Sequence, residues 1–324
     1  MKHDLKITVL LVLFFVLAQI VGLALINHKL ISEKAGVKVV GYEETVLGEL
    51  PRMSGEAVLL YVVVGVAIGT VIVLLIIRLR KVSLWRAWFF IAVFLAISLA
   101  LGVILKYHVA LLLALILALL KLFKPNVFIH NLTEVLMYAG ISFFIVGLFK
   151  DRVLWIALLL VLVSVYDFIA VFKSKHMVRM ARFQTKSRVF AGLFIPYTTG
   201  KDAPREQGVS AMPMRLIRGV QSPKRIKTRR VVQRKNAILG GGDVAFPLIF
   251  TGVVMHWLAN KFVRAGVATE VARSMAFYQS LIITLTTTIA LTFLFVFAKK
   301  DKFYPAMPFI TMGCFAGFVI ITLL

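Results

Sequence analysis

The stretch LGGGDVAFPLIF, residues 239–250, places Asp243 directly after three glycines and at the head of a long apolar run. A charged side chain at the centre of a membrane helix costs roughly 2.5–3.5 kcal/mol on insertion scales. Acids at membrane depth usually face a protein interior or a watery cavity. Asp243 is therefore a candidate functional residue.

The sequence around Asp243 predicts a loosened helix start. Glycine weakens a helix and lets backbones approach closely, and three glycines precede the acid: Gly240, Gly241 and Gly242. Pro247 has no N–H and cannot donate to the carbonyl of Asp243, four residues earlier. We expect this segment to admit water.

The composition of the whole chain predicts a membrane protein. Its 324 residues are 60% hydrophobic and its mean hydropathy is +0.94, whereas soluble domains are about 45–50% apolar. A helix needs ~20 apolar residues to cross a bilayer. We expect an all-α polytopic fold with nine transmembrane helices, at residues 6–27, 56–77, 83–105, 108–123, 132–149, 153–172, 237–260, 274–298 and 303–324.

Two of these spans need comment. The first is apolar as far as Ile26, longer than the ~7–15 residues of a signal-peptide core, so we expect it to be retained. The fourth has the shortest uncharged run, and we expect Lys106 and Lys121 to extend from its two ends to the membrane surface.

The connection at residues 173–236 decides the orientation, because it carries 17 Lys and Arg but only two acids. Basic loops stay in the cytoplasm. We expect this loop and the N-terminus to be cytoplasmic and the C-terminus extracytoplasmic, in an integral protein of the cell membrane. The predicted parts are spans one to six (1–172), the basic loop, and spans seven to nine (237–324). Within the loop, the apolar piece at 188–197 suits the membrane surface.

The net charge of +24 also raises the possibility of nucleic-acid binding. A membrane protein collects its basic residues in cytoplasmic loops, and we favour that explanation. Cys314 is the only cysteine and the six histidines are scattered. There is no internal disulfide, no H-E-x-x-H zinc motif and no expected metal or cofactor.

A second acid lies at membrane depth: Asp167, in the sixth predicted span. It comes six residues before Lys173, and Asp243 comes eight after Lys235, which places them ~9 Å and ~12 Å below the same surface at about 1.5 Å per residue. The two consecutive spans run antiparallel, so we expect the carboxyl groups to meet at one level. Glu134, near the start of its span, is read as interfacial.

Two carboxyl groups in contact do not readily both ionise, so they share one proton and titrate as a pair. The ionised member can take a proton from water while the protonated member polarises a peptide carbonyl, which is the chemistry of aspartic proteases.

Three motifs carry a resemblance to a known family. Tyr166–Asp167, the GGGD at 240–243 and the PAMP at 305–308 occur in that order on spans six, seven and nine. In this pattern the chain resembles the presenilin and signal peptide peptidase family of intramembrane aspartyl proteases (GxGD type), and most closely its archaeal presenilin-homologue branch. The resemblance covers essentially the whole chain.

The resemblance implies that Asp167 and Asp243 are the catalytic pair, hydrolysing peptide bonds in transmembrane segments of other proteins. It implies that the site is shaped by the glycines Gly240, Gly241 and Gly242, by Tyr166, and by Pro305, Ala306 and Met307. Met307 stands where the family usually has leucine, a change close in volume and apolarity. The implied partners are transmembrane peptides and the lipid bilayer, with no obligate accessory subunit.

Two other classes remain open at this point. Paired intramembrane acids beside broken helices also occur in proton- or cation-coupled transporters, although the chain shows no duplicated half. A membrane scaffold without activity leaves both buried acids unexplained.

Overall fold

The computed structural model describes residues 5–34, 37–42, 44–79, 81–124, 126–172, 191–201, 231–297 and 304–324. Within these ranges the chain forms nine helices: α1 (Leu5–His28), α2 (Gly55–Leu79), α3 (Val82–Leu101), α4 (Tyr107–Phe123), α5 (Val127–Phe149), α6 (Val153–Phe172), α8 (Gly241–Arg264), α9 (Thr269–Phe297) and α10 (Met307–Leu323). Seven of them are long and apolar enough to cross a membrane, and α4 and α10 are shorter apolar helices of 17 residues.

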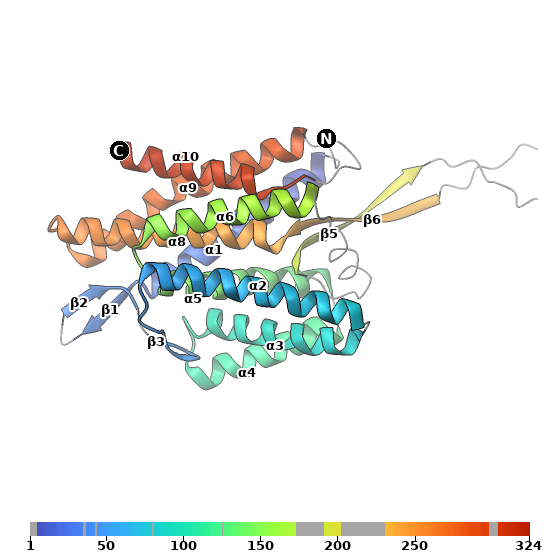
Figure 1. Cartoon of the computed structure of the whole chain (residues 1–324), viewed down its shortest axis with the longest axis horizontal. Coiled ribbons are helices and arrows are strands. Elements are labelled where there is room, and N and C mark those ends of the chain that lie inside the picture. The colour runs from blue at the N-terminus through green and yellow to red at the C-terminus, as the bar shows by residue number, and fades with distance from the viewer. Residues whose placement is uncertain are drawn as a thin grey trace, which may run out of the picture.

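The helices lie in one bundle around α1, α5 and α8 (Figure 1). Helices α3 and α4 cover one side of α5, and α9 and α10 lie on the opposite side, with α6 against α8 and α10. Of the seven long helices, α5 and α8 are the most enclosed by protein and α2 the least. The chain therefore places the helix that carries Asp243 at the centre.

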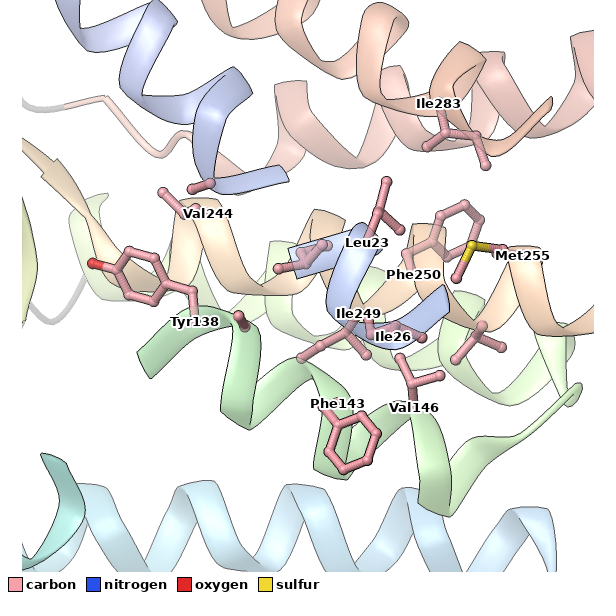
Figure 2. Close-up of a cluster of buried hydrophobic side chains, with 14 of the residues drawn as sticks. Leu23, Ile26, Tyr138, Phe143, Val146, Val244, Ile249, Phe250, Met255 and Ile283 are labelled. Carbon is pink, nitrogen blue, oxygen red and sulfur yellow. The ribbon is translucent and has the colours of Figure 1, made fainter. Parts of the chain in front are cut away.

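Apolar side chains from α1, α5 and α8 meet in one core, with Ile283 of α9 beside them (Figure 2). Close packing there depends on small residues. At Gly140 of α5, an added Cβ would lie 1.9 Å from the Ala96 carbonyl oxygen of α3. Any side chain at this position would force α3 and α5 apart, consistent with the use of small residues at membrane helix interfaces.

The structure contains strands that the all-α prediction did not include. At one end of the bundle, β1 (Ile31–Lys34) pairs with β2 (Val37–Val40), and β3 (Glu44–Thr45) with β4 (Gly48–Glu49). At the other end, β5 (Gly192–Lys201) and β6 (Val231–Gly240) form a long antiparallel hairpin that projects past the helices (Figure 1).

The β5–β6 hairpin corrects two expectations. Residues 237–240 belong to β6, so the seventh helix begins four residues later than predicted. Of the apolar piece expected on the membrane surface, 188–190 lie outside the described residues and 192–197 belong to β5, where Leu193 and Ile195 are buried against the bundle. Bundle packing and strand pairing explain its apolar residues.

Candidate active site

Asp167 lies near the end of α6 and faces the start of α10. The Met307 N–H donates to Asp167 Oδ2 over 3.2 Å, and Asp167 Oδ1 is buried with no hydrogen-bond partner among the described residues. Met307 is the first residue of α10, and a proline follows in the first turn, where its missing N–H costs nothing. The PAMP motif thus directs a helix N-terminus, which carries partial positive charge, at a carboxyl group.

A second bond joins the same two helices one turn further along. Ser164 Oγ and Thr311 Oγ1 are 2.7 Å apart. Ser164 precedes Asp167 by three residues and Thr311 follows Met307 by four, so both contacts lie on one seam between antiparallel helices. This seam holds Asp167 against α10 at two points.

Asp243 lies in the first turn of α8, and two of the three glycines before it have close neighbours. A Cβ at Gly240 would lie 3.0 Å from Asp243 Oδ2, and a Cβ at Gly241 would lie 3.0 Å from the Tyr138 ring. A Cβ at Gly242 would make only an ordinary contact, 3.7 Å from the Phe246 ring. The first two glycines therefore make room for the acid and for Tyr138.

The start of α8 is held from α1. Gln19 Nε2 donates to the Val244 carbonyl over 2.8 Å, and both residues are buried. Helix α8 continues through Pro247. The irregular geometry is the junction where strand β6 passes into α8, with Gly240 still extended at φ −62° and ψ 140°.

The structure brings the two aspartates to one end of the bundle. They lie near the end of α6 and at the start of α8, close enough for their carboxyl groups to interact electrostatically. Of the other predicted residues, Pro305 is buried, Ala306 is half-buried, and the Tyr166 side chain is 45% exposed beside the buried Asp167.

The described residues contain no group of three or more His, Cys, Asp or Glu side chains positioned to hold a metal ion. The two aspartates themselves meet the N-termini of α8 and α10 and the strand–helix junction before α8.

The sequence reasoning missed a buried polar cluster beside Asp243. Glu134 is fully buried rather than interfacial, and Lys121 does not extend to the surface but lies 2.5 Å from Glu134 Oε1. Tyr138 donates to Glu134 Oε2, and the same oxygen accepts from the Gly192 N–H of β5 over 3.0 Å. The available signal was the pairing of opposite charges on either side of the short turn between α4 and α5.

Comparisons with known proteins identify the family and the fold. Residues 7–324 match the family described as signal-peptide peptidase, presenilin aspartyl protease. Two solved structures of a presenilin family intramembrane aspartate protease share the fold. The C222 form is 18% identical with a TM-score of 0.57 over 98% of both chains. The P2 form is 17% identical with a TM-score of 0.55, over 97% of this chain and 96% of that one.

No curated protein matches the chain. The family match nevertheless covers nearly all of its length, including both aspartates and the PAMP motif. The chain belongs to the signal-peptide peptidase and presenilin family of aspartyl proteases.

Proposed function

We propose that Asp167 and Asp243 are the catalytic pair of this intramembrane aspartyl protease. The observation that carries the proposal is their convergence: Asp167 near the end of α6 and Asp243 at the start of α8 lie at the same end of two packed helices, within reach of each other's charge, and Asp167 is buried. Like charges held together in a protein interior favour a pair that shares one proton.

We assign different roles to the two acids. The Met307 amide and the start of α10 stabilise negative charge on Asp167, so Asp167 takes the proton from the attacking water. Asp243 carries the shared proton and polarises the carbonyl of the scissile peptide bond. In the tetrahedral intermediate the proton has moved from water to Asp167, and Asp243 donates to the new oxyanion.

We infer that the substrate is a transmembrane segment that unwinds before attack, because a helix hides its amides in its own hydrogen bonds. Gly192 and Phe194 of β5 turn their N–H and C=O groups toward α5, and their partners in β6 are Gly240 and Ile238. By the alternation of an antiparallel ladder, the partners turn theirs to the opposite edge. That edge leads straight to Asp243 and supports main-chain pairing with an extended substrate.

We further propose the orientation and the partners. The N-terminus lies at the hairpin end of the bundle and the C-terminus at the other (Figure 1). Together with the basic residues of 173–236, this arrangement supports a cytoplasmic N-terminus and an extracytoplasmic C-terminus in the cell membrane. In this proposal 1–172 and 237–324 supply one aspartate each, 173–236 is a connecting loop, and no accessory subunit is required.

Cleavage of a transmembrane peptide by the purified protein in detergent tests the catalytic pair. We expect Asp167→Ala and Asp243→Ala each to lower the rate by about 10³-fold or more, because acid and base act as a unit. Asp151→Ala is the matched control. Asp151 lies in the turn between α5 and α6, where its Oδ2 accepts from Asn260 Nδ2 over 3.3 Å and lies 3.7 Å from an Arg264 nitrogen.

Gel filtration of each variant checks that it is folded. Cleavage that persists in either folded variant would contradict the proposal. Ion flux across vesicles by a parent protein that never cleaves would favour the transporter instead.

A further inference from the structure

The outer edge of β5 is covered by polar side chains of α5. Asn131 Nδ2 donates to the Phe194 carbonyl over 2.9 Å, and Asn131 Oδ1 accepts from the Phe194 N–H over 3.0 Å. His130 Nε2 lies 2.9 Å from the Gly192 carbonyl, and Glu134 Oε2 is 3.0 Å from the Gly192 nitrogen. Each of these backbone groups therefore has a side-chain partner from one helix.

The pattern is the one that a third strand would provide. Gly192 and Phe194 are two residues apart, so their N–H and C=O groups point to the same edge of the sheet. A neighbouring strand would bond both groups of both residues, and the three α5 side chains do so in its place. An exposed strand edge invites pairing with other chains, and here that edge of β5 is closed.

We call these three α5 side chains, His130, Asn131 and Glu134, the edge cap. The edge cap is itself held in place by contacts within the bundle. Glu134 and Lys121 are both buried, and their 2.5 Å contact ties the cap to α4. A buried charge without its partner is strongly destabilising, so each charged group holds the other in place. Tyr138 donates to the same carboxylate, and its ring meets Gly241 at the start of α8.

The cap also reaches Asp243 through the hairpin. Gly192, bonded to His130 and Glu134, pairs in register with Gly240, and Gly240 directly precedes α8. A slip of β5 along α5 would move β6 and change the distance between its open edge and the carboxyl group. The buried side chains of the ribbon, Leu193 and Leu239 among them, favour one register, and the α5 side chains hold the backbone of β5 in that same register.

We propose that His130, Asn131 and Glu134 of α5 form an edge cap that fixes the register of the β5–β6 hairpin, and through it the peptide bond that is presented to Asp243. They are positioning residues, since none is assigned contact with the substrate. The inference rests on the proposed function, because it concerns which bond that site cuts.

The test is the set of product masses released from one transmembrane peptide by the full-length protein. Asn131→Ala removes two of the four bonds of the cap. His130→Phe removes a third and keeps a ring for the edge contact with Phe194, whose centroid is 5.2 Å away. The matched control is Asn126→Ala at the N-cap of the same helix: the exposed Asn126 side chain accepts from the Phe128 N–H at 3.3 Å, and its backbone carbonyl, which the substitution keeps, accepts from the His130 N–H.

We expect the share of product cut at the parent's main site to fall by about five- to hundredfold in Asn131→Ala, the equivalent of two lost hydrogen bonds. His130→Phe should shift the products in the same way, and Asn126→Ala should keep the parent's pattern. Loss of stability alone lowers the total yield and leaves the proportions unchanged, so unchanged proportions in both cap variants would overturn the edge cap.

Hydrogen exchange decides the case if a variant no longer cleaves. The edge cap predicts that the Phe194 amide exchanges about two- to tenfold faster in Asn131→Ala than in the parent. The amides of α9 should exchange at the parent's rate. Equal exchange at Phe194 would overturn the proposal. A parent protein that cleaves nothing would instead count against the proposed function, so the two failures are separate.

Discussion

The three glycines before Asp243 differ in what surrounds them, and this difference can be tested residue by residue. A Cβ at Gly240 would lie 3.0 Å from Asp243 Oδ2, whereas one at Gly242 has no atom closer than 3.7 Å. The backbone of Gly240 has a negative φ, which alanine adopts readily. A Cβ at position 240 would therefore press on the Asp243 carboxyl group without straining the backbone.

We expect Gly240→Ala to lower kcat by roughly 10- to 100-fold, because an acid displaced by less than an ångström is badly placed for catalysis. The thermal midpoint should change little, since a flexible side chain can move aside. Gly242→Ala should keep most of the activity. Steady-state cleavage and thermal unfolding in detergent measure both effects, and equal activity of the two variants would contradict this account.

The residues that can be singled out from the sequence are those in energetically costly positions. An aspartate inside an apolar run is rare enough that Asp167 and Asp243 could be singled out without a structure, and the structure brings them to one end of the bundle. Lys121 and Glu134 were wrongly assigned to the membrane surface, because each lies near the end of its span, where a charge costs little. Only packing of α4 on α5 shows that the two are buried together.

At the scale of elements, helices were easier to predict than strands. Apolar runs gave the order of the helices, because each run must cross the same hydrocarbon thickness. The β5–β6 hairpin was missed because its two strands lie about thirty residues apart in the sequence. Strand pairing over such a distance leaves no periodic signal in either segment.

The seam between α6 and α10 supplies a prediction at this scale. Ser164→Ala and Thr311→Val each remove one partner of a single hydrogen bond, and each should lower the free energy of unfolding by about 0.5–1.5 kcal/mol. The double variant should cost less than the sum, because the two residues share one bond. A double-mutant cycle of unfolding in detergent measures the coupling, and strict additivity would show that the bond contributes nothing.

For the whole molecule, the arrangement of the ends predicts which faces of the membrane they reach. The N-terminus and the β5–β6 hairpin lie at one end of the bundle, and the C-terminus lies at the other (Figure 1). Leu5 and Leu324 are both exposed, and Cys314 is fully buried, so the natural cysteine gives little background.

We expect a membrane-impermeant maleimide added to intact cells to label Leu324→Cys and not Leu5→Cys. Inverted vesicles should show the opposite pattern, since the basic residues of 173–236 hold the hairpin end in the cytoplasm. The parent protein with Cys314 alone is the control. Labelling of both variants from the same side would contradict an odd number of crossings.

The ion pair between Lys121 and Glu134 has a consequence for biosynthesis. Helix α4 has only 17 residues with which to reach across the lipid, so on its own it would hold Lys121 in the membrane without a counter-ion. Helix α5 brings that counter-ion only 13 residues later. We therefore expect the two helices to enter the bilayer together, as one hairpin.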